Sequence, residues 1–197
     1  MTARPRRARL WGWLWTGALI GCHASVIAAG RPVTLAATDG VTLAGQFYES
    51  AARPAAAVVL VHMESRTREH GDEVAQRMKA AGITVLAIDL RGHGTSGGSA
   101  APLAAMVPDV RAAVQWLSTR PTVRPDAIGV AGASLGANLA LLAAADQSVV
   151  RAVAAISPSL DYRGLRVGPE TMTKLAGRGV WLAASSQDPY SLRTLKE

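Results

Sequence analysis

The sequence predicts an α/β fold, in which a mostly parallel, twisted sheet carries helices on both faces and follows an N-terminal β-hairpin. Two observations predict it. Short apolar runs without alternation, each bounded by turn residues, are typical of strands that are buried on both faces. Segments with helical periodicity separate these runs, and alternating strands and helices indicate a parallel sheet. The apolar runs are residues 55–62, 83–90, 127–133, 150–157 and 179–185.

The hairpin is expected at the start of the domain. Residues 33–38 and 41–48 flank the dipeptide Asp39-Gly40. Both residues of this dipeptide favour positive φ angles, so the pattern predicts a two-residue turn between two antiparallel strands.

Three helices are expected between the later strands, at residues 69–81, 103–119 and 135–145. The first places Val74, Met78 and Ala81 on one face, which we expect to pack against the sheet. In the second, Pro108 either starts the helix or interrupts it. The third directly follows Ser134, and its alanines allow close packing against a sheet.

Length and composition fit one globular domain with a sizeable core. Of the 197 residues, 49% are hydrophobic and 18% are charged, which argues against an extended disordered region. The formal net charge is +7, but four of the 21 basic residues lie within the first ten positions. The remainder has 17 basic and 14 acidic residues and an ordinary net charge of +3. We therefore expect no nucleic-acid partner.

The N-terminus is typical of an export signal. Basic residues extend to Arg9, and the uncharged run 10–20 is shorter than the roughly 20 residues that span a bilayer. Leu19-Ile20-Gly21-Cys22 is similar to the bacterial lipoprotein signal, in which a small residue precedes the cysteine that is acylated. Cys22 is the only cysteine, so no internal disulfide can form. The alternatives are an uncleaved signal anchor and, more weakly, twin-arginine export through Arg6-Arg7.

This interpretation divides the chain into a lipoprotein signal peptide (1–21), a linker (22–31) and an α/β domain (32–197). The protein is then expected in the cell envelope, exported and attached to a membrane by lipid at Cys22, on the periplasmic face. His23, rather than an aspartate, follows the cysteine, which favours the outer membrane in a Gram-negative host.

A nucleophile motif stands between the run 127–133 and the helix 135–145. Gly132-Ala133-Ser134-Leu135-Gly136 fits the pattern G-x-S-x-G at the strand-to-helix turn where that pattern acts. Such a turn is strained, and its close backbone approaches require neighbours without side chains. The helix that follows directs its partial positive charge at a developing oxyanion. The motif predicts that Ser134 is a nucleophile; the alternative is a turn that serves close packing only.

With these residues the chain resembles the α/β-hydrolase superfamily over about residues 33–197, most closely its dienelactone hydrolase-like and prolyl-oligopeptidase-like serine esterases. The likeness also rests, in the order of the family, on these segments: the hairpin Thr38-Asp39-Gly40-Val41-Thr42-Leu43, Val61-His62-Met63, the loop Asp89-Leu90-Arg91-Gly92-His93-Gly94-Thr95-Ser96, and Asp188 after the run 179–185.

The resemblance implies roles for four residues. Ser134 would be the nucleophile, and the backbone N–H groups of Met63 and Leu135 would form the oxyanion hole. Asp188 would be the acid that orients a histidine, or alternatively the N-cap of a helix that starts at Pro189. The family often has glycine where this chain has Met63, a difference that changes the pocket's shape. The pocket is also expected to draw on loop residues 92–100 and 159–168.

No histidine stands where the resemblance implies the base of the triad. The resemblance implies a base after the acid, but the four histidines, His23, His62, His70 and His93, all precede Ser134. We expect His62 to brace the oxyanion loop, His70 to face solvent and His93 to be structural, as its loop is in the family. The alternative is that one of these three supplies the base. The sequence ends inside a predicted helix, 190–197. The expectation is therefore a domain incomplete at its C-terminus, without the last strand, the last helix and the catalytic histidine.

The predicted function is that of a serine hydrolase that acts on a carboxylic ester, lactone or similar small acyl substrate through an acyl-enzyme, and that is inactive as this fragment. No His, Cys or carboxylate cluster has metal-ligand spacing, so neither a metal nor another cofactor is expected. One alternative is a non-catalytic α/β-hydrolase-fold lipoprotein that lacks the histidine and binds a ligand. A purely structural envelope lipoprotein would need neither Ser134 nor Asp188. The sequence predicts no oligomeric state.

Overall fold

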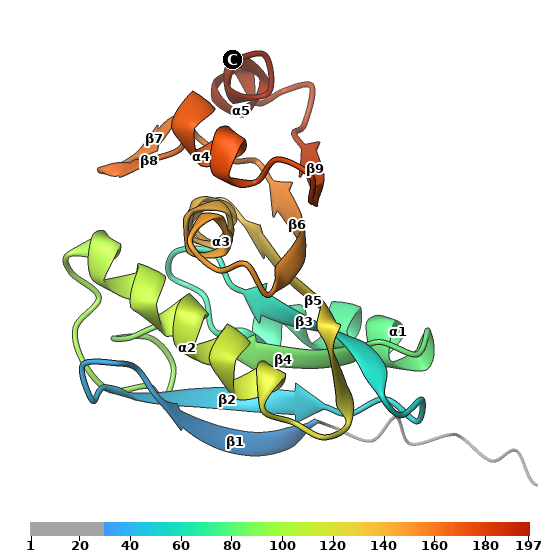
Figure 1. Cartoon of the computed structure of the whole chain (residues 1–197). Helices are drawn as coiled ribbons and strands as arrows, with labels where there is room; N and C mark the ends of the chain where they lie inside the picture. The colour runs from blue at the N-terminus through green and yellow to red at the C-terminus, as the bar shows by residue number, and fades with distance from the viewer. Residues whose placement is uncertain (1–29) are drawn as a thin grey trace, which may run out of the picture.

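The computed structural model describes residues 30–197, so the predicted signal peptide, Cys22 and most of the linker lie outside the described residues (Figure 1). A seven-stranded sheet forms the centre, in the order β1 (Arg31–Ala36), β2 (Thr42–Tyr48), β4 (Thr84–Ile88), β3 (Ala55–Val61), β5 (Val123–Ala133), β6 (Val150–Ile156) and β9 (Gly179–Ala183). The short hairpin β7 (Asp161–Tyr162) and β8 (Leu165–Arg166) is separate. The helices are α1 (Asp72–Ala80), α2 (Val107–Ser118), α3 (Leu135–Ala145), α4 (Pro169–Lys174) and α5 (Pro189–Thr194), with 3₁₀ turns at Arg68–Gly71 and Leu103–Met106.

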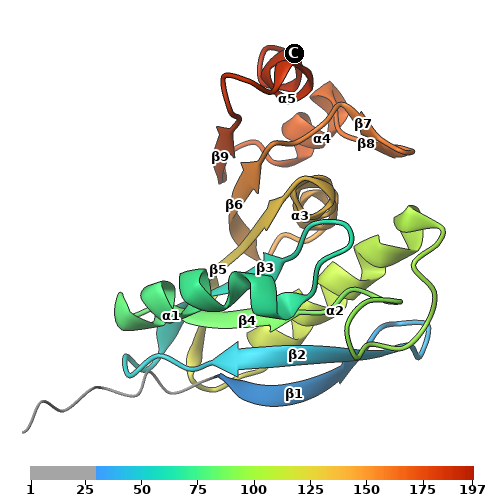
Figure 2. The ribbon, with the colours of Figure 1, turned by 180° about the vertical axis from the view of Figure 1, so that it is seen from behind.

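The predicted fold class is confirmed. Strands β4, β3, β5, β6 and β9 are parallel to one another. At the edge next to β4, β2 pairs antiparallel with β4, and β1 pairs antiparallel with β2. Helices α2 and α3 cover one face of the sheet and α1 lies on the other (Figures 1 and 2). In β4, Leu86 and Ile88 belong to the large core, whereas Val85 and Ala87 belong to the smaller one that includes α1.

Burial of the strands on both faces is confirmed for β4 but not for the sheet's far side. All five residues of β4 are buried, because α1 packs on β4 and β2. By contrast, Ile156 in β6 and Trp181 in β9 are 47% and 57% exposed. Within residues 30–197 no helix covers β6 and β9 on the α1 side of the sheet, so an apolar surface lies open there.

The leading hairpin forms, but its turn is longer than predicted. The Ala37 N–H donates to the Val41 carbonyl at 2.9 Å, and the Gly40 N–H donates back to the Ala37 carbonyl at 2.9 Å. Gly40 has a φ of 82°, whereas Asp39 is not among the residues with positive φ. The prediction that both residues would adopt positive φ is therefore wrong, because one glycine suffices to close the longer turn.

The observed helices agree with the predicted ones in α2 and α3 but differ in part in α1. Helix α3 has the bounds that the sequence predicts, and Pro108 stands in the first turn of α2. In α1 the predicted inward face is confirmed for Met78, which packs against the smaller core, and wrong for Val74, which is 52% exposed; Ala75 is the residue that is fully buried. The inward stripe runs through Ala75 and Met78, which are three positions apart, instead of through Val74 and Met78. None of the helices in residues 30–197 is long and apolar enough to cross a bilayer.

Candidate active site

Ser134 occupies a sharp turn between β5 and α3. Its φ of 52° and ψ of −119° lie outside the regions that non-glycine residues usually adopt. Two hydrogen bonds hold this conformation: the Ser134 N–H donates to the Ile156 carbonyl at 2.9 Å, and the Ser134 carbonyl accepts from the Ala137 N–H at 2.9 Å. A strained residue that is fixed from both sides is typical of functional sites.

The two glycines of the motif are required by close contacts. A Cβ on Gly132 would lie 2.3 Å from the Gly136 carbonyl oxygen. A Cβ on Gly136 would lie 2.4 Å from the Val61 carbonyl oxygen and 2.7 Å from that of His62. Helix α3 therefore approaches the end of β3 at a distance that only glycine allows, and the turn has the tight geometry that the motif predicts.

The two predicted oxyanion donors lie at the same edge of the sheet. Met63 follows β3, and Val61 at the end of β3 is paired with Gly132 in the neighbouring β5. Leu135 is the first residue of α3. Its N–H is one of the four at a helix start that have no acceptor within the helix. The structure thus brings Met63, Leu135 and Ser134 to one end of the parallel strands.

His62 braces the loop that carries Met63, as the sequence predicts. Its side chain is buried, the Leu90 N–H donates to Nε2 at 3.0 Å, and Nδ1 lies 2.7 Å from the Met63 carbonyl oxygen. This pattern assigns the proton to Nδ1, because Nε2 must accept and the carbonyl must receive a donor. Burial lowers the pKa of His62 and favours the neutral ring. Both ring nitrogens are therefore engaged.

The other two described histidines lie nearby but do not bind Ser134. The His93 ring packs against the His62 ring at a centroid distance of 5.0 Å, and His93 Nδ1 lies 3.0 Å from the Arg91 carbonyl oxygen. His70 is exposed in the turn before α1, as predicted. It lines a groove of about 300 Å³ together with Met63 and residues of the nucleophile turn. Within residues 30–197, no hydrogen bond joins Ser134 to a histidine.

Asp188 stands after β9 and caps α5. Its Oδ1 accepts from the Ser191 N–H at 3.0 Å and its Oδ2 accepts from the Ser191 hydroxyl at 2.6 Å. These bonds, with the Ser191 hydroxyl as the largest influence, lower the pKa of Asp188. Ser157, the residue after β6, has a φ of 51°. The structure thus shows the N-cap; the role of Asp188 as the acid stays a prediction.

Two residues that the sequence did not single out join the hairpin β7–β8 to the loop after β3. Tyr162 in the hairpin donates a hydrogen bond to Glu64 Oε2 at 2.7 Å, and Glu64 directly follows Met63. The only signal for them was the expectation that residues 159–168 line the pocket. No periodicity reveals a bond between residues 98 positions apart.

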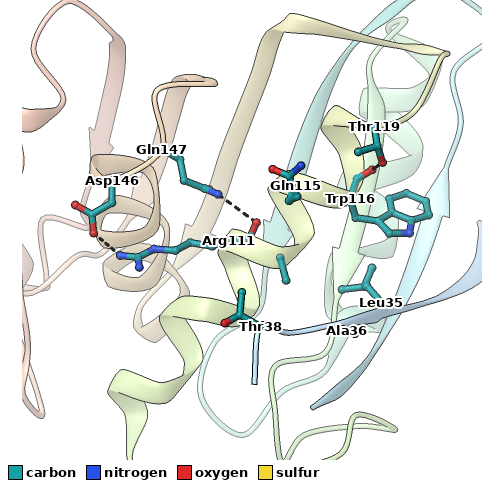
Figure 3. Close-up of a pocket in the computed structure, with 10 residues that line it drawn as sticks. Leu35, Ala36, Thr38, Arg111, Gln115, Trp116, Thr119, Asp146 and Gln147 are labelled. Carbon is teal, nitrogen blue, oxygen red and sulfur yellow. Dashed lines mark hydrogen bonds and ion pairs between the residues drawn. The ribbon is translucent and has the colours of Figure 1, made fainter. Parts of the chain in front are cut away.

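A larger hollow of about 510 Å³ lies away from this site (Figure 3). It is bordered by β1, by α2 and by Asp146 and Gln147 just after α3. Ser134 precedes the same 11-residue helix, so roughly 16 Å of helix separate the two places. An ion pair between Arg111 and Asp146 crosses part of the hollow. Within residues 30–197 there is no group of three or more His, Cys, Asp or Glu side chains that could hold a metal.

Comparisons with known proteins agree with this geometry. Residues 52–190 match the family model described as serine aminopeptidase, S33. The chain is similar to the polyketide transferase ATR5 of Stachybotrys chlorohalonatus, with 35% identity over 63% of this chain and 43% of that protein. It is also similar to the thiohydrolase apmlB of Arthrinium phaeospermum, with 36% identity over 61% of this chain and 40% of that protein.

The solved structures extend the likeness to the fold. The esterase Pf2001 of Pyrococcus furiosus matches with a TM-score of 0.58 and 28% identity, over 66% of this chain and 50% of that one. The chain spans only about two-fifths of the length of the curated relatives it matches. The narrower likeness to dienelactone hydrolases or prolyl oligopeptidases stays a prediction. Because the family model covers most of the domain, the chain belongs to the serine aminopeptidase S33 family of α/β-hydrolases.

Proposed function

We propose that this protein is a serine hydrolase that cleaves a small acyl substrate, a carboxylic ester, lactone or thioester, through an acyl-enzyme. The observation that carries the proposal is the turn at Ser134. Its φ of 52°, together with glycines that have no room for a Cβ, is a conformation that presents a hydroxyl at the head of a helix.

In the proposed reaction, Ser134 Oγ attacks the carbonyl carbon of the substrate and its proton passes to a base. The oxygen of the tetrahedral intermediate then accepts hydrogen bonds from the N–H groups of Met63 and Leu135. Collapse of the intermediate expels the alcohol or thiol, which takes up the proton, and leaves the acyl group on Ser134. Water releases the acid in a second, equivalent step.

The base is proposed to come from outside residues 30–197. His62 has both nitrogens engaged, and neither His70 nor His93 is hydrogen-bonded to Ser134. Asp188, at the end of β9, would orient that base. A protein without that base is expected to keep only oxyanion-hole and binding effects, which are worth roughly 10³ to 10⁴ over water.

The names of the relatives favour acyl substrates. A thiohydrolase, a polyketide transferase and an esterase are among the proteins that the chain resembles. A thioester or oxygen ester is therefore proposed ahead of an amide, even though the family is named after an aminopeptidase.

Attachment to the envelope membrane through Cys22 is a further part of the proposal, and it rests on the sequence pattern at residues 19–22. Two or more lipid chains suffice for stable attachment, whereas a single chain is marginal. Cys22→Ala should move the protein from the membrane fraction to the soluble fraction or leave its precursor unprocessed. Mass spectrometry that finds an unmodified Cys22 in the mature protein would refute this part alone.

The test of the activity compares the protein expressed from its natural gene with its Ser134→Ala variant. On p-nitrophenyl esters and acyl thioesters, the substitution should lower kcat by about 10⁶, as loss of a triad serine does elsewhere. Hydrolysis that survives the substitution would show that another group is the nucleophile. The alternative, a ligand-binding lipoprotein without turnover, is favoured if the natural protein binds acyl compounds but Ser134→Ala and the parent are equally inactive.

A further inference from the structure

The two proposed oxyanion donors lie on separate elements. The N–H of Leu135 belongs to helix α3, and the N–H of Met63 belongs to the loop after β3. These elements meet where a Cβ on Gly136 would lie 2.4 Å from the Val61 carbonyl oxygen, but Met63 lies two residues beyond that contact. The Met63 N–H donates no hydrogen bond to any atom of residues 30–197. Its position therefore depends on what holds the loop on either side.

Met63 is held from both sides by its neighbours in the chain. On one side, its carbonyl oxygen lies 2.7 Å from Nδ1 of the buried His62 ring. On the other side, the Glu64 carboxylate binds the hairpin β7–β8: Oε2 accepts from the Tyr162 hydroxyl at 2.7 Å, and Oε1 accepts from the Arg163 guanidinium. The Tyr162 hydroxyl has the largest influence on the pKa of Glu64 and lowers it, so the carboxylate is ionised at neutral pH.

Helix α3 holds the same hairpin at its base. The fully buried Asn138 side chain donates to the carbonyl oxygens of Ser159 and Leu165 at 2.6 and 2.9 Å, and it accepts from the Ser159 N–H at 2.9 Å. The tip of the hairpin is a two-residue turn in which Arg163 and Gly164 have φ angles of 50° and 95°. The hairpin is thus a short bridge between the first turns of α3 and the loop after β3.

We propose that this bridge sets the separation of the two oxyanion donors, and that Glu64 is the positioning residue through which it acts. The inference rests on the proposed function, in which the N–H groups of Met63 and Leu135 bind the oxyanion. Asn138 fixes the bridge to the helix that begins at Leu135, and Glu64 fixes it next to Met63. Donors that are held in place before the reaction need no reorganisation when the negative charge develops.

The first test measures the order of the Met63 N–H without any catalysis. The protein expressed from its natural gene is labelled with ¹⁵N-methionine, and the Met63 amide signal is identified by its loss in Met63→Leu. Its order parameter on the ps–ns timescale should fall from about 0.85 to below about 0.6 in Glu64→Ala. It should fall less in Glu64→Gln, which retains an oxygen for the Tyr162 hydroxyl.

Two controls accompany this measurement. The amide of the buried Met106 should stay ordered, which shows that the variants are folded. Glu170→Ala removes an 88% exposed carboxylate on α4 and should leave the Met63 signal unchanged. An order parameter at Met63 that does not respond to Glu64→Ala overturns the proposal, whether or not the protein is active.

The second test measures the oxyanion hole itself. A trifluoromethyl ketone forms a tetrahedral adduct with a nucleophilic serine and places an oxyanion in the hole, so its affinity follows transition-state stabilisation. In Glu64→Ala, kcat and the affinity for the ketone should both fall about 10- to 100-fold, with KM unchanged, because small displacements of positioning groups have effects of this size. Tyr162→Phe removes one of the two bonds to Glu64 and should have a smaller effect of the same kind.

The outcomes separate this inference from the proposed function. If Glu64→Ala does not fold, Tyr162→Phe and Glu64→Gln provide the same comparison. An unchanged kcat, or a change in KM alone, would make the hairpin a wall of the pocket and overturn the proposal. Activity that survives Ser134→Ala would refute the proposed function instead, and the order parameter of Met63 would still show whether Glu64 holds the loop.

Discussion

Gly136 has no room for any side chain, because its missing Cβ would lie 2.4 Å from the Val61 carbonyl oxygen. That contact sets how closely α3 approaches β3 and therefore where the first N–H groups of α3 lie relative to Met63. The identity of one residue thus controls the geometry of the proposed oxyanion hole. The same reasoning applies to Gly132, which faces Gly136 across the turn.

Gly136→Ala should accordingly lower the free energy of unfolding by about 1–3 kcal/mol, because backbone rather than a flexible side chain must give way. The variant protein that does fold should also have a lower hydrolytic activity than the parent. Gly168→Ala is the control, since a Cβ at Gly168 meets nothing within 4 Å. Chemical denaturation of the two variants gives the comparison; equal stabilities would mean that α3 can shift away from β3 at little cost.

The buried His62 predicts how the stability of the fold depends on pH. Burial lowers its pKa, so the folded state resists the proton that the unfolded state accepts below about pH 6.5. Its contribution to stability is therefore complete above that pH and is lost as the pH falls. The slope reaches at most about 1.4 kcal/mol per pH unit. In His62→Gln the decline in Tm between pH 7 and pH 5 should be shallower than in the parent. Parallel declines would show that His62 ionises freely in the fold.

At the scale of elements, a buried ion pair joins α2, the loop after β4 and the hairpin turn. The Arg91 guanidinium donates to the Asp109 carboxylate at 2.6 Å, and both side chains are almost fully buried. A second arm of the guanidinium reaches Asp39 in the turn at 2.6 Å, and this contact lowers the pKa of Asp39. The three segments that frame one end of the sheet thus share one cation.

Asp109→Asn should destabilise the fold by about 3–5 kcal/mol, because it removes the only buried negative charge that faces the buried Arg91 guanidinium and leaves it the half-exposed Asp39 alone. The matched control is Asp126→Asn, which removes a carboxylate from an exposed pair with Arg124 and should leave the Tm nearly unchanged. Differential scanning calorimetry measures the Tm of both variants and of the parent. If both variants melt together, water compensates the charge of Arg91 more fully than its burial indicates.

The elements that the sequence predicts well are those with strong local signals. Helix α3 was predicted with its observed bounds, since Ser134 precedes a run rich in Leu and Ala that ends at Asp146. Val74 was assigned to the wrong face, because α1 has few apolar residues and Met78 can share a face with either Val74 or Ala75. The hydrogen bond between Tyr162 and Glu64 could not be predicted, because it depends on how two segments 98 residues apart pack against each other.

At the scale of the whole molecule, the α1 side of the sheet is unevenly covered. A groove of about 310 Å³ runs over β5, β6 and β9, with an almost entirely apolar lining that includes Trp181. Within residues 30–197, β9 pairs with β6 alone and forms the edge of the sheet. An apolar edge strand of this kind promotes pairing between chains.

Residues 1–197 alone should therefore self-associate, and Trp181→Lys should reduce that tendency by placing a charge on the exposed edge. Tyr190→Lys offers a matched control, as it adds the same charge at a residue that is exposed on α5 instead. Sedimentation velocity at several concentrations measures the effect. A monomeric parent chain at all concentrations would contradict the expectation.

The nucleophile is the central claim, and labelling with a fluorophosphonate tests it most directly. In the protein expressed from its natural gene, peptide mapping by mass spectrometry should find one adduct per chain, on Ser134. The adduct should be absent in Ser134→Ala and retained in Ser157→Ala, whose serine has a similar positive φ at the end of the next strand. An adduct on Ser157 or on any other serine, with Ser134 unmodified, would contradict the account.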